Sequence, residues 1–388
     1  MREELAAALP FLGKKPLGAL RMPAEWERHD ATWIAWPHHE PDWPGKLGPI
    51  PWVYAEIVRA LHRYEPVDIL CHDESVRASA RDTLAAHGVV ATDAGMRNAG
   101  ARNAAAPRAA THPVRLHVAP NDRVWVRDSG PTGALREDGS VVWVNWAFNA
   151  WAKYDNYTRD ALVGRAVADA TGLARVEPQR PDGQGRLVLE GGGIETNGQG
   201  IMLVTEEWLL SDVQVRNPGL GREDYERAFR EWLGIRQTIW LGEGCVGDDT
   251  HGHIDDVARF VGPDTIVLAY EADPADDNHL RSADNLERLQ LAGGDRGALR
   301  VVTLPFPRAV EMEGQRLPAS YANFYVGNGV VLVPTFNDRN DRVALNTLAE
   351  LMPDHDVVGV HAVDLVWGLG TLHCLTQQQP AAQPRSGR

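Results

Sequence analysis

Four short hairpins recur along the chain at nearly constant spacing, and this recurrence restricts the possible folds more than any other feature. In each hairpin an apolar strand follows a turn rich in Gly, Asn or Asp. The turn glycines Gly139, Gly198, Gly262 and Gly327 lie 59, 64 and 65 residues apart. Such a recurrence predicts repeated units, each made of a hairpin, a helix and another strand, and Thr32–Trp36 is a candidate for an earlier copy. The alternative is a chance recurrence of ordinary hairpins.

Stretches with apolar residues near the 3.6-residue period alternate with these strands, which places the chain in the α/β class. The predicted helices are Val53–Tyr64, Ser75–His87, Tyr157–Thr171, Glu223–Leu233, Asp284–Leu291 and Asp341–Leu351. True repeats would pack around a pseudo-symmetry axis, with a site where their strand ends converge. We expect one catalytic domain over residues 1–388, with a loose N-terminal lead-in at 1–21, a surface insert at 95–113 and a tail at 379–388.

The composition excludes several classes of protein. The net charge is −14, and no nucleic acid is expected as a partner because nucleic-acid binders present a basic face. A small cationic substrate suits an acidic chain better. No stretch approaches the ~20 uninterrupted apolar residues of a membrane span, so no membrane is expected as a partner. Three cysteines in a long chain without a signal sequence favour a reducing, cytoplasmic location.

Two polar clusters lie directly before turns. Arg127 and Asp128 interrupt a strand-like run ahead of a Gly-Pro turn, and Glu190 ends an apolar run that is followed by three glycines. Glycines at such a position let a ligand approach the backbone closely. The alternatives are a surface ion pair for the first cluster and a tight turn with an exposed carboxylate for the second.

The densest polar cluster contains His251, His253 and Asp255 within nine residues rich in charge. On a strand, two histidines one residue apart face the same way, as in a metal site, and this interpretation makes the chain a metallohydrolase. In the metal-free alternative, one histidine is a general acid and base and Asp255 binds a cationic group.

Cys374 is a candidate nucleophile because glycine-rich backbone precedes it and the chain has only three cysteines. By itself, a free cysteine is more often a small core residue. A thiol, a histidine and several carboxylates together suit attack on a positively charged carbon. This combination favours the metal-free interpretation.

Six motifs, in order along the chain, resemble the agmatine deiminase family. Its members are relatives of the bacterial peptidyl-arginine deiminases within the pentein superfamily of guanidino-modifying proteins. The motifs are Trp33–His38, Trp125–Pro131, Leu189–Gly192, Gly252–Asp255, Ser320–Tyr325 and His373–Gln378. The resemblance implies a five-bladed α/β propeller of pseudo-repeats around a central site. It also implies catalysis without a metal or an organic cofactor.

The resemblance also assigns roles to individual residues. It implies that Cys374 is the nucleophile, that His253 is the general acid and base, and that Asp128 and Asp255 bind the guanidinium. Glu190 matches an acidic position of the family near the substrate. We further place three residues in the substrate site: Trp36, Trp125 and Arg127. The two tryptophans are candidates because an indole face attracts a flat cation.

The implied reaction is the hydrolysis of agmatine to N-carbamoylputrescine and ammonia through a covalent thiouronium on the cysteine, and the family suggests a homodimer. The sequence departs from the family pattern in two of the motifs. In the histidine motif, His251 replaces an Asp and Asp256 an Asn; in the nucleophile motif, Leu369 replaces a Gly and Thr371 an Asn. Deimination of peptidyl-arginine or of a free arginine derivative is therefore an alternative. A guanidine-binding protein without activity is another.

Overall fold

The fold is built from a recurring unit in which a hairpin is followed by a helix and a third strand. A computed structural model describes residues 19–95, 111–293 and 299–383. In four units the hairpin strands pair antiparallel, and the strand after the helix pairs parallel with the second hairpin strand. The first two units are β6 (Thr132–Arg136), β7 (Val141–Val144), α4 (Val163–Thr171) and β8 (Arg175–Val176), then β9 (Glu195–Thr196), β10 (Ile201–Thr205), α6 (Arg222–Leu233) and β11 (Gln237–Leu241). The next two are β12 (Ala258–Phe260), β13 (Thr265–Tyr270), α7 (Asn278–Gly293) and β14 (Arg300–Pro305), then β17 (Tyr325–Gly327), β18 (Val330–Thr335), α8 (Asn340–Leu351) and β19 (Asp356–His361).

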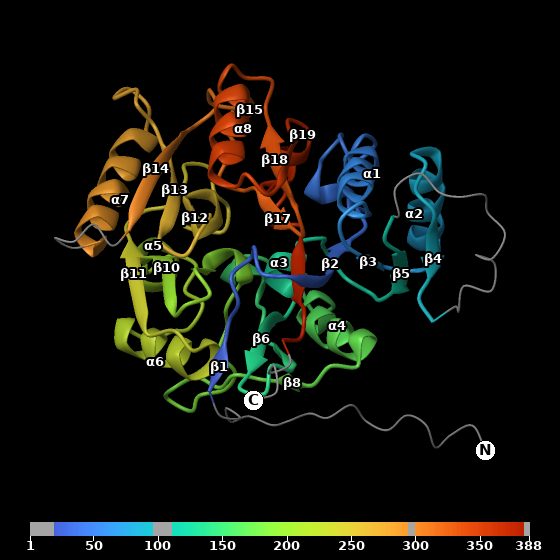
Figure 1. Cartoon of the computed structure of the whole chain (residues 1–388), viewed down its shortest axis with the longest axis horizontal. Helices are drawn as coiled ribbons and strands as arrows, with labels where there is room; N and C mark the ends of the chain where they lie inside the picture. Colours follow the sequence, from blue (N-terminus) through green and yellow to red (C-terminus); the bar gives the residue numbers. More distant parts are fainter. Residues whose placement is uncertain (1–18, 96–110, 294–298, 384–388) are drawn as a thin grey trace.

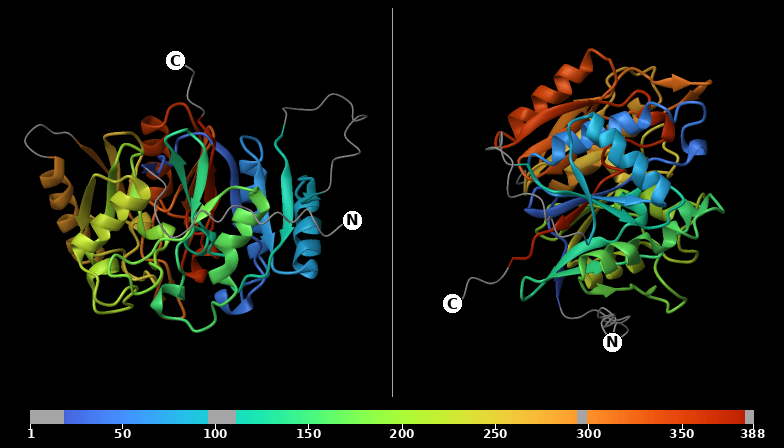
Figure 2. Two further views of the ribbon diagram at one scale, coloured as in Figure 1. Left: turned by 90° about the horizontal axis from the view of Figure 1, so that it is seen from below. Right: turned by 90° about the vertical axis from the view of Figure 1, so that its right-hand side faces the viewer.

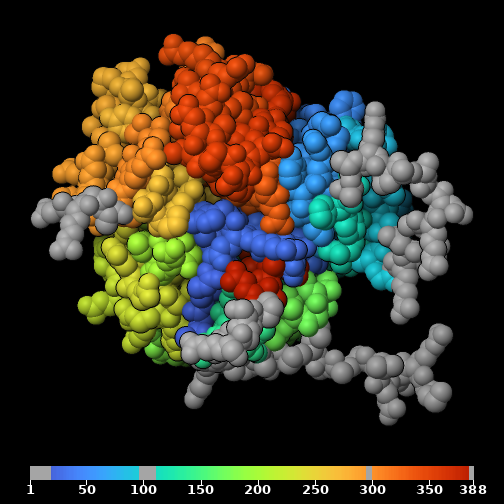
Figure 3. Space-filling view, viewed as in Figure 1, coloured from blue at the N-terminus to red at the C-terminus, as the bar shows by residue number. Residues whose placement is uncertain are grey.

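The fifth unit joins the two ends of the chain. Its strands and helix are β2 (His29–Ala35), α1 (Ile50–Leu61), β3 (Val67–Cys71) and β20 (Gln377–Pro380). β20 pairs antiparallel with β2, and β2 pairs parallel with β3, so a C-terminal strand supplies the partner that a hairpin supplies elsewhere. Figure 3 shows the N-terminal segment crossing the middle of one face beside the C-terminal segment. Three further elements extend this unit: α2 (Glu74–Ala86), β4 (Ala91–Asp93) and β5 (Val114–Val118).

The repeat predicted from the turn glycines is therefore confirmed, including the earlier copy at Thr32–Trp36. The predicted helices are also found, with shifted ends. α7 begins six residues earlier than expected, and the stretch 157–171 divides into the short 3-10 helix Asp160–Leu162 and α4. Figures 1 and 2 show α2 and α7 at opposite ends of the molecule. The closed five-bladed propeller and the single-domain organisation stay predictions.

The predictions of a loose lead-in and a tail are wrong where the structure describes strand residues in these segments. Within the expected lead-in, β1 (Leu20–Arg21) pairs antiparallel with Leu135 and Arg136 of β6. The expected tail begins inside β20, where Gln379 pairs with Ala31. Backbone hydrogen bonds to β-sheet partners order both segments, because buried backbone groups require such partners. Residues 1–18 of the lead-in, residues 96–110 of the insert and the last five residues of the tail lie outside the described residues.

Tryptophans supply much of the core. Those less than 2 % exposed are Trp33, Trp36, Trp43, Trp143, Trp208 and Trp232. Each large apolar side chain contributes about 1.5–3 kcal/mol when it leaves water, so these residues favour the compact packing of units against one another. Across residues 19–95, 111–293 and 299–383, no helix has the length and apolar character needed to cross a bilayer.

Short helical segments at the ends of the strands meet near the middle of the molecule. They are α3 (Val126–Ser129) and the 3-10 helices η4 (Gly191–Gly193), η5 (Ile254–Asp256) and η6 (Leu365–Gly368). η4 contacts both α3 and η5, and Figure 1 shows α3 near the centre of the view. Each segment carries or precedes one of the polar clusters singled out in the sequence. The fold thus brings together residues from four units.

Candidate active site

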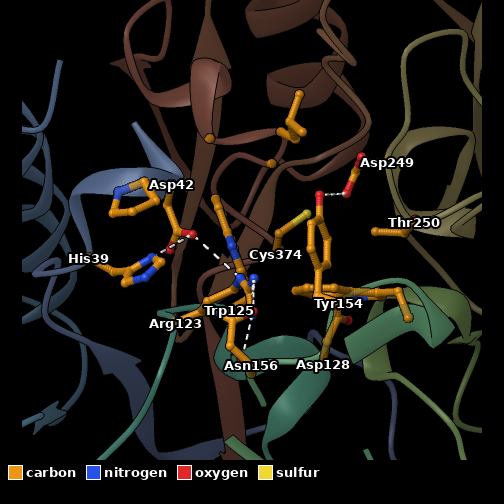
Figure 4. A pocket seen from close by; sticks show the side chains of 15 residues that line it. His39, Asp42, Arg123, Trp125, Asp128, Tyr154, Asn156, Asp249, Thr250 and Cys374 are labelled. Atoms are coloured by element: carbon orange, nitrogen blue, oxygen red, sulfur yellow. Dashed lines mark hydrogen bonds and ion pairs between the residues drawn. The ribbon is translucent and has the colours of Figure 1, made fainter. Parts of the chain in front are cut away.

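A cavity of about 280 Å³ opens beside Cys374. Its size is close to the lower end of the ~300–1,000 Å³ range of small-molecule sites, so it suits a small ligand. The side chains along its wall are aromatic, acidic and amide-bearing, with one guanidinium (Figure 4). The lining residues are His39, Pro41, Asp42, Arg123, Trp125, Asp128, Trp151, Tyr154, Asn156, Asp249, Thr250, Gly368, Leu369, Gly370 and Cys374.

Cys374 lies in a turn that Asn323 holds in place. The turn begins at Leu369, whose φ is +68°. Asn323 accepts a hydrogen bond from Oγ1 of Thr371 at 2.7 Å, and its Nδ2 donates to Sγ of Cys374 at 3.1 Å. A donor directed at the sulfur favours the thiolate, since a hydrogen bond to the charged form stabilises that form. Both positions at which the sequence departs from the family pattern in this motif therefore shape the nucleophile turn.

His253 and Asp255 reach the same place from η5. Sγ of Cys374 donates to Oδ2 of Asp255 at 3.6 Å. Oδ1 of Asp255 and both ring nitrogens of His253 are buried and have no hydrogen-bond partner among the described residues. A buried polar atom without a partner costs about 1–3 kcal/mol, so such a group of atoms marks a place for a ligand.

Asp128 completes the acidic side of the site. Its Oδ1 accepts the backbone N–H of Gly192 at 2.9 Å, and its Oδ2 accepts Nε1 of Trp151 at 2.9 Å. Gly192 lies between three functional side chains: a Cβ there would lie 2.6 Å from Nδ1 of His253, 2.8 Å from Oδ1 of Asp128 and 3.1 Å from Oδ2 of Asp255. Only glycine lets these three side chains come this close. The close approach of these three side chains, rather than a ligand alone, therefore explains the glycine at position 192.

Glu190 contacts His253 and stabilises the protonated form of its ring. Its Oε2 lies 3.5 Å from Nε2 of His253 and accepts Nε1 of Trp208 at 2.7 Å. Its Oε1 accepts Nε of Arg216 at 3.2 Å. Burial would raise the pKa of Glu190, but Arg216 and His253 lower this pKa to about 2. Burial would lower the pKa of His253, but Asp128, Glu190 and Asp255 raise it to about 9. With this pKa, His253 is an imidazolium at neutral pH.

Burial and the neighbouring carboxylates favour the protonated thiol of Cys374. Burial, followed by the charges of Asp255, Asp256 and Asp128, raises the pKa of Cys374 well above its usual value. Burial also raises the pKa of Asp128 to about 6, against the attraction of His253. A cation that neutralises the carboxylates removes the electrostatic part of these shifts. The site is therefore arranged to form a thiolate when a cationic ligand arrives.

Arg127 does not line the cavity, contrary to the sequence prediction that it binds substrate. Its guanidinium points away from the cavity, where Nη1 donates to Oε1 of Gln378 at 2.7 Å and Nη2 lies 3.4 Å from Oε2 of Glu25. In the short helix α3, Arg127 and Asp128 are neighbours and their side chains point to different sides. Arg127 thus holds the backbone behind the site.

Of the two tryptophans predicted to face a cation, the structure places only Trp125 at the cavity. Trp36 is fully buried and packs edge-on against Tyr54 at 6.0 Å between ring centroids. Its place at the end of a central strand directs it into the core. The prediction that Trp36 binds substrate is therefore wrong.

The structure also separates the residues of the metal alternative. His251 has a φ of +65° and is followed by Gly252 at +100°, so the pattern forms a turn rather than a strand. Its Nε2 lies 2.9 Å from Oγ of Ser211, on a groove away from Cys374. Among the residues that the structure describes, no three His, Cys, Asp or Glu side chains are grouped as a metal site requires. The three proposed ligands thus do not meet.

Comparisons with known proteins agree with this geometry. The family model of the Porphyromonas-type peptidyl-arginine deiminases matches residues 21–380. The agmatine deiminase of Stutzerimonas stutzeri is 35 % identical over 384 residues, which cover 93 % of this chain and 95 % of that protein. The agmatine deiminase of Pseudomonas aeruginosa is 33 % identical over 385 residues with the same coverage. The chain belongs to the agmatine deiminase family.

Solved structures of agmatine deiminases share its fold. The enzyme of Enterococcus faecalis superposes with a TM-score of 0.80 at 28 % identity, covering 95 % of this chain and all of that one. A cysteine-to-serine variant of the C. jejuni enzyme with substrate bound superposes with a TM-score of 0.78 at 26 % identity, covering 94 % of this chain and 97 % of that one. This chain therefore has the pentein α/β fold of the agmatine deiminase family.

Several residues of this family member were not assigned a role from the sequence. His373 and Asn323 lie inside motifs that carried the resemblance. Asn323 contacts Sγ of Cys374 directly, and His373 contacts Asp255. Asp42, Arg123 and Tyr154 line the cavity without belonging to any pattern that predicts a site. Their contribution depends on tertiary contacts, which no local sequence signal reports.

Proposed function

We propose that the protein hydrolyses the guanidino group of agmatine to N-carbamoylputrescine and ammonia, with Cys374 as a covalent nucleophile. The observation that carries this proposal is the grouping of His253, Asp128 and Asp255 around Gly192, within reach of the sulfur. The agmatine deiminases among its relatives support agmatine as the substrate.

The guanidinium binds between the carboxylates of Asp128 and Asp255. Paired N–H donors of a planar guanidinium match carboxylate oxygens, and the unpartnered Oδ1 of Asp255 is available to accept one of them. Two such contacts orient the central carbon toward Sγ of Cys374, which lies 3.6 Å from the other oxygen of Asp255. Positioning of this kind contributes much of the rate of a reaction between bound groups.

Substrate binding activates the thiol. Before substrate binds, burial and the charges of Asp255 and Asp128 disfavour the thiolate, and the guanidinium then cancels the charge of the two carboxylates. The thiol proton leaves to solvent as the cation enters, and the resulting thiolate attacks the guanidinium carbon. His253, already protonated, gives its proton to the leaving nitrogen. Ammonia departs and an S-alkylthiouronium remains on Cys374.

Hydrolysis of this intermediate returns the enzyme to its starting state. His253, now neutral, takes a proton from water while the hydroxide attacks the thiouronium carbon. The tetrahedral intermediate gives its hydroxyl proton to the sulfur as the C–S bond breaks, so Cys374 is released as the thiol and the neutral ureido product leaves. The side chains of Trp125 and Trp151 along the cavity exclude bulk water from the intermediate.

An ammonia-release assay over a panel of guanidines tests the proposal. We expect turnover of agmatine to exceed that of arginine, an arginine peptide and methylguanidine, and we expect no change when a chelator is added. If an arginine peptide is turned over faster than agmatine, peptidyl-arginine would replace agmatine as the proposed substrate. Loss of ammonia release in the chelator would instead revive the metal-dependent alternative. The homodimer and the cytoplasmic location stay predictions, which size-exclusion chromatography and cell fractionation test.

A further inference from the structure

The cavity beside Cys374 contains more acidic side chains than the guanidinium requires. Asp128 faces the reacting end, but two further carboxylates, Asp42 and Asp249, also line the cavity. Figure 4 shows them on opposite sides of Cys374. Among the described residues, the lining thus has three carboxylates against the guanidinium of Arg123 and the imidazole of His39, a balance that favours a cationic ligand.

Asp249 is already fully engaged within the protein. Its Oδ2 accepts the hydroxyl of Tyr154 at 2.7 Å, and its Oδ1 forms an ion pair with Lys153. Both oxygens therefore have partners, and a ligand would have to displace one of them. Asp249 shapes the wall of the cavity through Tyr154 but leaves no unused acceptor.

Unlike Asp249, Asp42 has one carboxylate oxygen without a hydrogen-bond partner among the described residues. Its side chain is only 8 % exposed, and its Oδ1 lies 3.1 Å from Nδ1 of His39 and 3.4 Å from Nε of Arg123. Its Oδ2 is buried and has no hydrogen-bond partner among the described residues. Carboxylate oxygens accept hydrogen bonds, so the second oxygen of Asp42 remains an acceptor without a donor.

The donors of Arg123 are largely used. Its Nη1 donates to the backbone oxygen of Asn156 at 2.9 Å and its Nη2 to Oδ1 of the same residue at 2.7 Å. Its guanidinium lies 4.5 Å from the centre of the Tyr154 ring. Arg123 is therefore held against the wall, where it orients Asp42.

We infer that Asp42 accepts the distal ammonium of the substrate and makes the enzyme selective for guanidines with a second positive charge. This inference rests on the proposed deimination of a guanidine at Cys374. Agmatine carries an ammonium at the end opposite its guanidinium, and an ammonium has three donors for the unpartnered Oδ2. Trp125 and Tyr154 line the cavity between these groups, where apolar faces suit the methylene chain.

A substrate pair isolates this contact. Butylguanidine reproduces agmatine except for the ammonium, so the ratio of the two kcat/KM values measures recognition of the distal charge. We expect the wild-type enzyme to prefer agmatine, and we expect Asp42→Asn to lower that preference by about 10- to 100-fold through the agmatine value. The amide introduced by this substitution keeps an oxygen that can accept from His39 and Arg123. Asp42→Ser, which also lacks the charge, provides a second variant with the same expected result.

Asp249→Asn is the matched control. It also removes one negative charge from the cavity wall and also leaves one cation, Lys153, without its partner. If only the general electrostatic field mattered, both variants would lose the preference equally. We expect Asp249→Asn to change it by less than about threefold.

The outcomes separate this inference from the proposed function. Ammonia release from butylguanidine with an unchanged preference in Asp42→Asn and Asp42→Ser would overturn the role of Asp42 while leaving deimination in place. A wild-type preference for arginine over agmatine would also overturn it, because Arg123 would then be binding a carboxylate. No ammonia from any guanidine would instead contradict the proposed function itself.

Discussion

Nδ1 of His373 lies 2.7 Å from Oδ2 of Asp255, so the residue directly before the nucleophile holds a carboxylate that we assign to the guanidinium. The other ring nitrogen, Nε2, lies 2.8 Å from Oε2 of Glu25. His373 is 1 % exposed and its two contacts reach residues far away in the sequence. One buried ring therefore connects the N-terminal segment, η5 and the nucleophile turn.

Replacing His373 tests this relationship with two complementary variants. In His373→Asn, the side-chain amide lies near the Nδ1 position and retains a donor toward Asp255. In His373→Gln, the amide lies near the Nε2 position and retains the donor toward Glu25. We expect kcat/KM to fall about 100-fold in the Gln variant and about tenfold in the Asn variant, because displacement of Asp255 misplaces the substrate. Steady-state kinetics at equal thermal stability checks this order, and the reverse order would show that His373 acts through Glu25 alone.

Gly192 gives a steric prediction. A Cβ at this position would meet His253, Asp128 and Asp255 at 2.6, 2.8 and 3.1 Å, so at least one of the three must move. We expect Gly192→Ala to lower kcat/KM about 100-fold or more, since misplaced catalytic groups lose most of their effect. Gly48→Ala is the control, because a Cβ at Gly48 has nothing within 4 Å. Near-normal activity of the Gly192 variant would show that the three groups are not used together.

The pH dependence of kcat/KM reports ionisations of the free enzyme. The reacting form has lost the thiol proton of Cys374, whose pKa is raised, and has kept the proton of His253, whose pKa is about 9. Log kcat/KM therefore rises with a slope of about one as the pH increases toward 9 and then levels off as His253 loses its proton. Below about pH 6 the slope steepens, because Asp128, with a pKa of about 6, also becomes protonated.

Glu190→Gln shifts the upper end of this profile. Glu190 raises the pKa of His253 by its charge and its contact, and Arg216 would be left unpaired beside the site. Both changes lower the pKa of His253, so the profile should level off well below pH 9. A plateau that still begins near pH 9 would contradict the assignment of Glu190. Thermal unfolding of the variant controls for the loss of the buried ion pair.

Leu369 gives a prediction about backbone conformation. Its φ of +68° lies in the left-handed region, which costs about 1–2 kcal/mol in a residue with a Cβ. Leu369→Ala removes the side chain but keeps this cost, whereas Leu369→Gly removes both. We expect the Gly variant to unfold with a free energy about 1 kcal/mol higher than the Ala variant in urea titrations. Equal stabilities would show that the turn adopts another conformation in solution.

Much of the fold was predictable from local signals. The hairpins have turn glycines and β-branched strands close together in the sequence, so their pairing needs no distant partner. The strand β20 has no such local signal. Gln377–Pro380 is a polar segment, and only its pairing with Ala31 and neighbouring residues of β2 makes it a strand. Contacts between the two ends of the chain are what the sequence could not report.

The site residues likewise divide into features that local sequence signals mark and features that they do not. Cys374, His253, Asp128 and Asp255 are marked by glycines and polar clusters, and the structure brings them together. Arg127 shares a cluster with Asp128, yet it faces the opposite way because consecutive side chains of a short helix point in different directions. Local patterns thus located the cluster but not the direction of each side chain.

The central claim is that Cys374 carries the substrate as a covalent thiouronium. Mixing enzyme with excess agmatine, quenching in acid within one turnover and analysing the peptides by mass spectrometry tests it directly. We predict that the peptide containing Cys374 gains the mass of agmatine less ammonia, and that Cys374→Ser binds agmatine without this gain and without ammonia release. Ammonia release by the serine variant at a near-normal rate, or an adduct on any other residue, would contradict the account.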